Sequence, residues 1–316
     1  MQFDFHGHFW TVAPWLLHLV RPVAAPPSSP FYVRIDDPQI GLVRLHGRIR
    51  HAPGSKSLLV AVHGLGGDVE SHYVLAAARA ADQAGLSCLR LNMRGAGGGA
   101  ADFYHAGLFS DLHAALQAPE LDRYERIVIL GYSLGGHVSL RYAASGAVDP
   151  RVRGVSAVCP PLDLNRSAAE IDKPERWVYR RHLLEGLKAM YADVATRRPV
   201  AVPLRDAFAI RTLREWDGRV VAPRYGFQSA EHYYAEESAG PRLGSIAVPS
   251  LLVATEGDPM VPAHTLRPAL ENAPPALLVK WLHIGGHVGF PKTVRVGEGT
   301  TSEGLERQVI DWLSAR

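Results

Sequence analysis

The sequence predicts an α/β fold with a doubly wound, mainly parallel sheet of about eight strands and a helical insertion. Short apolar runs alternate with amphipathic segments along most of the chain, and this alternation stops between residues 163 and 245. The composition agrees, since 316 residues that are 47% hydrophobic and 21% charged can bury the large core that such a sheet requires.

The first two predicted strands, 31–35 and 41–50, show partial alternation and flank an Asp-Asp-Pro turn, which favours an antiparallel pair at the sheet edge. The later runs are continuously apolar, as in strands that are covered on both faces: 58–62, 87–91, 127–130, 152–158, 250–255 and 277–283. Helices are predicted over 71–83, with Gly85 after its end, over 109–117, from the turn after 127–130 to about 144, and over 305–313.

We therefore divide the chain into four parts. They are an N-terminal segment packed on the core (1–30), the first part of the core (31–162), a helical cap or lid insertion (163–245) and the second part of the core (246–316). The insertion has no strand–helix alternation and contains several aromatic residues, so we expect it to cover the site. The alternative is that its helices only add packing.

Residues 9–20 are mostly apolar but too few to span a bilayer, and Pro14 and His18 interrupt them. No Lys or Arg precedes them, as a signal peptide would require, although Asp4 does. We expect a segment that packs on the core; contact with a membrane surface is the alternative.

The net charge of +3 includes no block of Lys or Arg, so the sequence does not indicate a nucleic-acid partner. The two cysteines, Cys88 and Cys159, lie in apolar runs. This favours buried, reduced thiols and a cytoplasmic protein.

The run 127–130 leads into Gly131-Tyr-Ser-Leu-Gly and then into a predicted helix. This order is typical of a nucleophile elbow, a strained turn in which small neighbours at Gly131 and Gly135 leave room for the chain. The hydroxyl of Ser133 would stand at a helix N-terminus, where backbone N–H groups stabilise negative charge. Alternatively, Ser133 only caps the helix.

A serine nucleophile needs a base and an acid that orients the base. His287 lies in a glycine-rich loop after the last predicted strand, and Asp258 directly follows the strand 250–255. Because the carboxyl ends of parallel strands meet at one edge of a sheet, we expect both near Ser133. The order Ser, Asp, His is that of α/β-hydrolases. His283 and Glu256 are the alternative base and acid.

An oxyanion hole needs backbone N–H groups near the reacting carbonyl. We expect these from Leu134, which follows the nucleophile, and from Leu65, in the turn after 58–62. The predicted substrate-binding residues follow strands at the same edge: His63, Gly64, Tyr132 and Cys159. We expect the His63 ring itself to be hydrogen-bonded within its loop rather than to act as a base.

The 15 histidines are scattered and form neither a His-Glu-x-x-His motif nor part of a Cys/His quartet. The glycines from 95 to 99 lack the Gly-Lys-Ser/Thr ending of a phosphate loop. The sequence therefore predicts neither a metal site nor a cofactor.

Eight stretches together carry a family resemblance: His63-Gly-Leu-Gly-Gly, Asn92-Met-Arg-Gly, Tyr104-His-Ala-Gly with Asp111, Gly131-Tyr-Ser-Leu-Gly-Gly, Tyr233-Tyr with Ser238, Asp258-Pro-Met-Val-Pro, Gly285-Gly-His-Val-Gly-Phe, and His8 with Thr11. The chain resembles the YheT-like α/β-hydrolases, which include ABHD-type esterases and lipases and yeast medium-chain ester synthases. The resemblance implies Ser133 as nucleophile, Asp258 as acid and His287 as base. This chain departs from the family pattern at His137, where the family often has Asn, and at Gly257, where the family often has Asp.

From these residues we expect a serine-dependent carboxylic ester hydrolase that acts on short- to medium-chain acyl esters through an acyl-enzyme intermediate. Its partner would be a small-molecule acyl ester. Alternatives on the same triad are an alcohol O-acyltransferase or a thioesterase. An alternative of another class is a non-catalytic binding protein with this fold.

Overall fold

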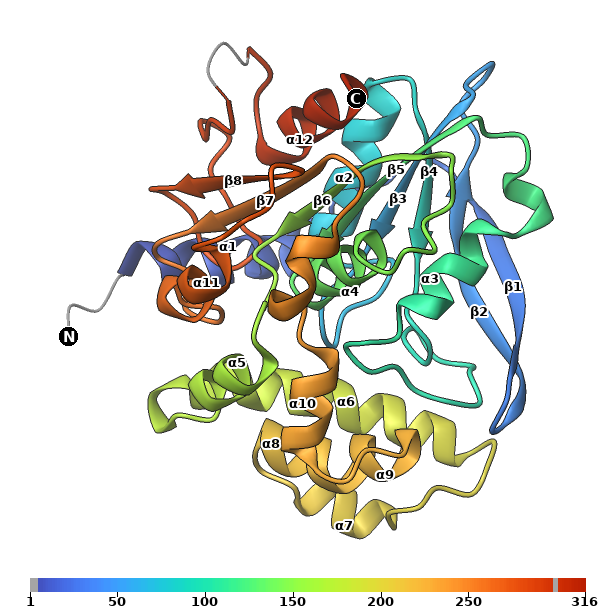
Figure 1. Ribbon diagram of the computed structural model, residues 1–316, viewed down its shortest axis with the longest axis vertical. Helices are drawn as coiled ribbons and strands as arrows, with labels where there is room; N and C mark the ends of the chain where they lie inside the picture. The colour runs from blue at the N-terminus through green and yellow to red at the C-terminus, as the bar shows by residue number, and fades with distance from the viewer. Residues whose placement is uncertain (1–4, 298–300) are drawn as a thin grey trace.

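An eight-stranded sheet in the order β1-β2-β4-β3-β5-β6-β7-β8 forms the centre of the computed structural model, which describes residues 5–297 and 301–316 (Figure 1). The pairs that involve β2 are antiparallel and the other neighbouring pairs are parallel. This confirms the predicted mainly parallel sheet. The strands are β1 (Ser29–Asp37), β2 (Gly41–Arg50), β3 (Ser57–Val62), β4 (Ser87–Leu91), β5 (Arg126–Tyr132), β6 (Val152–Val158), β7 (Ser250–Thr255) and β8 (Leu277–Leu282).

Helices cover both faces of this sheet, which explains why its central strands are apolar throughout. In β3, Leu59 and Ala61 face the core that contains α2 and α12, whereas Leu58 and Val60 face the core that contains α3 and α4. The helices of these layers and their connections are α2 (His72–Gln83), α3 (Phe109–Leu116), η1 (Pro119–Leu121), α4 (Leu134–Ala143), α11 (Ala263–Leu270) and α12 (Leu305–Ser314).

Between β6 and β7 the chain forms helices with no strand among them, and they gather in one layer below the sheet in Figure 1. The buried residues of α6 (Trp177–Ala195) are Leu183, Leu184, Leu187, Met190, Tyr191 and Val194. We refer to these helices as the cap: α5 (Leu164–Ile171), η2 (Pro174–Arg176), α6 (Trp177–Ala195), α7 (Leu204–Ala209), α8 (Leu213–Trp216), η3 (Asp217–Val221), α9 (Ala222–Tyr225), α10 (Ala230–Glu237) and η4 (Gly240–Ser245).

A buried cluster of charges fastens the cap to the sheet. Arg94, in the loop after β4, contacts the carboxylates of Asp37 at 2.6 Å, Asp102 at 2.9 Å and Asp111 at 2.6 Å. Arg224 of α9 contacts Asp102 at 2.6 Å. The cluster therefore joins the β1–β2 hairpin, α3 and the cap. Each buried charge in it is neutralised by the opposite charges of the others.

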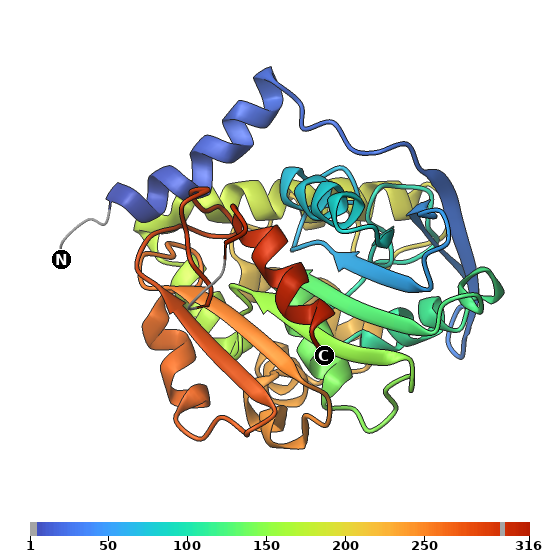
Figure 2. The same ribbon diagram turned by 90° about the horizontal axis from the view of Figure 1, so that it is seen from above.

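The N-terminal segment forms α1 (Phe5–Val20), whose residues are mostly exposed or half-buried. Gly7 is buried, whereas Phe5 and Val20 are each 82% exposed, and the C-terminal half of α1 projects from the molecule in Figure 2. The start of the predicted segment 1–30, including Asp4, lies outside the described residues. Among the helices that are described, none is both long and apolar enough to cross a membrane.

Candidate active site

Ser133 lies in a sharp turn between β5 and α4, with φ 50° and ψ −119°. A Cβ at Gly131 would lie 2.3 Å from the carbonyl oxygen of Gly135, so the turn requires a glycine there. Leu134 is the first residue of α4, so its N–H has no acceptor within the helix. The local structure is thus that of the predicted elbow, with a free N–H beside the hydroxyl.

His287 connects the hydroxyl of Ser133 to the carboxylate of Asp258. The Nε2 atom of His287 lies 2.8 Å from Ser133 Oγ, and its Nδ1 atom lies 2.9 Å from Asp258 Oδ2. Asp258 Oδ1 accepts from the N–H groups of Met260 at 2.8 Å and Val261 at 2.9 Å. These two bonds hold the carboxylate so that Nδ1 carries the proton and Nε2 is free to accept one from Ser133.

The two alternative residues lie elsewhere. His283 is exposed on the loop after β8. Glu256 forms an ion pair with Arg267, at 2.5 Å. Neither residue forms a hydrogen bond with Ser133 or His287, whose partners in the triad are Asp258 and each other.

The turn after β3 has one N–H that is available to a ligand. Gly64 N donates to the hydroxyl of Tyr73 at 3.1 Å, and Gly66 N donates to the hydroxyl of Tyr104 at 2.8 Å. Within the described residues, the N–H of Leu65 between them has no acceptor. The two tyrosines orient the loop, and the sequence analysis assigned them no part in it.

Thr11 of α1 is a further contact that the sequence analysis quoted only within the family resemblance. Its Oγ1 accepts from the N–H of His287 at 2.7 Å and donates to the carbonyl of Gly7 at 2.7 Å. The helix and the loops that carry Asp258 and His287 approach each other closely through their backbones: a Cβ at Gly7 would lie 1.6 Å from Gly257 O, and one at Gly286 would lie 2.2 Å from Gly7 O. The His-x-x-Thr motif was the available signal, but its partner lies 276 residues away.

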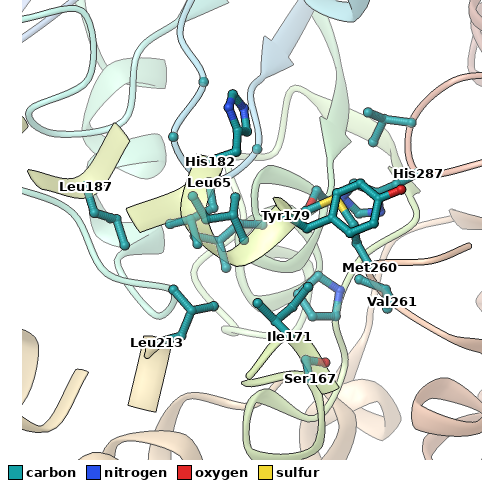
Figure 3. A pocket seen from close by; sticks show the side chains of 18 of the residues that line it. Leu65, Ser167, Ile171, Tyr179, His182, Leu187, Leu213, Met260, Val261 and His287 are labelled. Carbon is teal, nitrogen blue, oxygen red and sulfur yellow. The ribbon is translucent and has the colours of Figure 1, made fainter. Parts of the chain in front are cut away.

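Ser133 and His287 both line a pocket of about 490 Å³. Figure 3 shows His287 among the side chains of its wall. Gly64, Leu65 and Leu134 line its sheet side. Side chains of α1 and the cap complete its wall, among them Trp15, Ile171, Tyr179, His182, Leu187 and Leu213. The pocket therefore brings the predicted nucleophile and both predicted N–H donors to one largely apolar space.

Three residues predicted to bind substrate do not line this pocket: His63, Tyr132 and Cys159. His63 is fully buried; its Nδ1 lies 2.8 Å from Gly64 O, and its Nε2 accepts from Met93 N. Burial lowers the pKa of His63 to about 4, so the ring is neutral. Its role is structural, in line with the expectation that the ring is hydrogen-bonded within its loop.

Tyr132 and Cys159 belong to the core between the sheet and α2 and α12. Burial raises the pKa of both side chains well above their ordinary values. The prediction of substrate contact for the three residues was wrong because following a strand determines the edge at which a residue lies but not the direction of its side chain.

Potential ligand atoms of Cys159, Asp258 and His287 lie within 4.8 Å of one another, close enough to contact a single metal ion. However, the imidazole and carboxylate of this group already hydrogen-bond each other. The geometry is explained by these bonds without a metal, and the expected absence of a metal and a cofactor stays a prediction.

The fold is that of α/β hydrolases, and a family model described as alpha/beta hydrolase fold matches residues 57–291. The chain is 30% identical over 296 residues to the putative esterase YheT of Escherichia coli K12, covering 90% of this chain and 85% of that protein. It is 22% identical over 265 residues to human phospholipase ABHD3, covering 81% of this chain and 64% of that protein. The chain therefore belongs to the α/β-hydrolase family, in its YheT/ABHD-type group, and is a hydrolase.

One further relative and one solved structure are also similar. A monoacylglycerol lipase of Saccharomyces cerevisiae is 24% identical over 274 residues, covering 83% of this chain and 58% of that protein. The solved structure of the Pyrococcus furiosus esterase Pf2001 superposes with a TM-score of 0.53 at 16% identity, covering 91% of this chain and 90% of that chain. The structural similarity concerns the fold alone.

Proposed function

We propose that this protein is a serine-dependent carboxylic ester hydrolase with Ser133 as nucleophile, His287 as base and Asp258 as orienting acid. The observation that carries the proposal is the continuous chain of contacts from Asp258 Oδ2 through His287 to Ser133 Oγ, at 2.9 and 2.8 Å, opening on an apolar pocket. The esterase and lipase names of the similar proteins support the same reaction class.

In the proposed reaction Ser133 Oγ attacks the acyl carbonyl as His287 Nε2 takes the hydroxyl proton. The N–H groups of Leu65 and Leu134 stabilise the tetrahedral oxyanion. His287 then gives its proton to the leaving alkoxide, which departs as the alcohol. Water, deprotonated by His287, attacks the acyl-Ser133 ester and releases the carboxylic acid and the free serine.

We further propose that residues 163–245 act as a cap that excludes water and holds the acyl chain. The apolar cap residues that line the pocket, such as Leu187 and Leu213, support this role. The pocket volume of about 490 Å³ is within the range of small-molecule sites. The proposed substrates are esters of short- to medium-chain acids.

Contact with a lipid surface through α1 is a proposal supported by its exposed Phe9, Leu16 and Leu17. Co-sedimentation with phosphatidylcholine vesicles tests it, since replacing the three by Ser should reduce the bound fraction. Equal sedimentation of both proteins would contradict it. A cytoplasmic location is supported by Cys88 and Cys159, which are buried and unpaired.

Hydrolysis of p-nitrophenyl esters from acetate to palmitate, by the wild type and by Ser133→Ala, tests the proposed function. We expect activity that peaks at one chain length and disappears in the variant, which should melt at the same temperature as the wild type. Full turnover by Ser133→Ala would refute the assignment. Inactivity of both folded proteins on every ester would instead favour acyl transfer to a special acceptor or a binding role.

A further inference from the structure

Asp217 places a carboxylate in the cap wall of the pocket, whereas Ser133 and His287 line its sheet side. The hydroxyl of Tyr234 donates to Asp217 Oδ2 at 2.6 Å. The charge of Arg214 lowers the pKa of Asp217, but its guanidinium contacts Glu231 at 2.5 Å instead of Asp217. Among the described residues, Asp217 therefore has no ion-pair partner.

Burial is the main reason that the pKa of Asp217 rises to about 7, and the charge of nearby Asp172 acts in the same direction. A carboxylate in such surroundings destabilises the fold unless a hydrogen-bond donor satisfies it. The hydrogen bond from Tyr234 uses only part of the accepting capacity of Asp217, because a carboxylate accepts up to about four hydrogen bonds.

Ser167 of α5 is a second polar side chain of the pocket wall with unused capacity. It is 8% exposed, and its hydroxyl has no hydrogen-bond partner in the part of the chain that the structure describes. Figure 3 shows it among the cap side chains of the pocket, together with Ile171 and Leu213. Its helix packs against α8 and α10, the helices that carry Trp216 and Tyr234, the neighbours of Asp217.

The charges of the wall restrict what this polar region can bind. The acidic residues that line the pocket are Asp68, Glu70 and Asp217, and no described Lys or Arg lines it, so a phosphate or carboxylate group would be repelled. An ammonium group offers donors only and leaves the Ser167 O–H without an acceptor. A hydroxyl group can both donate to a carboxylate such as Asp217 and accept from a serine hydroxyl such as Ser167.

We propose that Asp217 and Ser167 form a polar subsite for a hydroxyl group that the ester substrate carries away from its reacting carbonyl. The inference rests on the proposed ester hydrolysis and specifies its substrate class: uncharged, hydroxyl-bearing esters. The two residues determine specificity and take no part in the bond-breaking steps.

The test compares matched esters with and without the hydroxyl. On the acyl side they are p-nitrophenyl ω-hydroxyalkanoates and alkanoates of six to twelve carbons; on the alcohol side, butyrate monoesters of α,ω-diols and of 1-alkanols. At pH 8, where Asp217 with its pKa of about 7 is mostly ionised, we expect the wild type to prefer the hydroxylated ester in kcat/KM by at least about tenfold at one chain length, the usual effect of a hydrogen bond to a charged group.

Variants separate the carboxylate from its tyrosine. The double variant Asp217→Leu/Tyr234→Phe should lose the preference without leaving an unpaired tyrosine hydroxyl, whereas Tyr234→Phe alone should keep it. Ser167→Ala should reduce it several-fold. No preference in the wild type on either side, or an undiminished preference in the double variant, would overturn the subsite, as would its complete loss in Tyr234→Phe alone.

A binding measurement keeps this test independent of turnover. Methyl ω-hydroxyalkanoates should raise the melting temperature of Ser133→Ala protein more than methyl alkanoates do, and addition of Asp217→Leu/Tyr234→Phe should remove the difference. Failure of the proposed function appears separately, as absent hydrolysis of all the plain esters. Equal melting shifts from both ester series would reject the subsite even then.

Discussion

The N–H of His287 donates to the side chain of Thr11 across 2.7 Å, so a helix near the start of the chain holds the loop of the proposed base. Thr11→Val keeps the shape of the side chain but leaves this N–H without an acceptor. We expect kcat on p-nitrophenyl butyrate to fall about ten- to hundred-fold, as for an unsatisfied buried donor, with a smaller change in KM. Thr11→Ser should restore kcat. Equal kcat values for the Val variant and the wild type would show that the loop holds its position without Thr11.

Asp258 offers a test of the proposed acid against its sequence neighbour. Asp258→Asn retains an oxygen for Met260 N and Val261 N, but its amide would favour the wrong tautomer of His287. We expect kcat to fall by roughly 10³ to 10⁴, the loss that this exchange causes in a serine protease triad. Glu256→Gln, which only breaks a surface pair with Arg267, should leave kcat unchanged. A larger loss in the Gln variant would reverse the assignment.

Arg94 neutralises carboxylates that have almost no access to water, and this makes it important for stability. Its own side chain and that of Asp102 are 2% and 1% exposed. Arg94→Met should lower the free energy of unfolding by about 3–5 kcal/mol, because it leaves buried charges unpaired. Arg181→Met, which breaks an exposed pair with Glu185, is the matched control and should have little effect. Urea unfolding measures both, and similar losses would contradict the prediction.

His137, one of the differences from the family pattern, lies in α4 and is fully buried. Its ring faces the segments where the chain enters and leaves the cap. Its Nδ1 lies 2.6 Å from Pro161 O and its Nε2 lies 2.8 Å from Glu237 O. Burial lowers its pKa to about 4 although these carbonyls oppose the shift, and Arg141 adds to it. The folded protein thus binds this proton less readily than the unfolded chain, whose histidines titrate near pH 6.5.

The stabilising contribution of neutral His137 is therefore complete above about pH 6.5 and is lost as the pH falls towards about 4. A shift of this size corresponds to roughly 3 kcal/mol. We expect His137→Asn to flatten the decline of unfolding free energy over this interval, measured by urea titration at several pH values. Because burial also lowers the pKa of His63, His72 and His105, part of the decline should remain. An unchanged slope in the variant would indicate that His137 does not titrate there.

The elements that the sequence predicted well depend on local patterns. The conformation of β3 could be predicted because a strand that is buried on both faces is apolar at every position. The turn after β5 could be predicted because its steric crowding requires small residues at adjacent positions, as in Gly-Tyr-Ser-Leu-Gly. His287 and Asp258 could be proposed as partners because strand ends of a parallel sheet share an edge. Contacts made by single side chains across the fold were missed, including those of Thr11 and Tyr104.

By itself, then, the sequence determined the alternation of strands and helices, the elbow at Ser133 and the resemblance to a family. Only the tertiary structure decided which way each side chain points. The side chains of Tyr132 and Cys159 point into a hydrophobic core, and Thr11 contacts the loop of His287. The tertiary structure also left Asp217 and Ser167 with unused hydrogen-bonding capacity in the pocket wall. The physical reason is that secondary structure follows from neighbours in the chain, whereas the direction and satisfaction of a side chain depend on packing between distant segments.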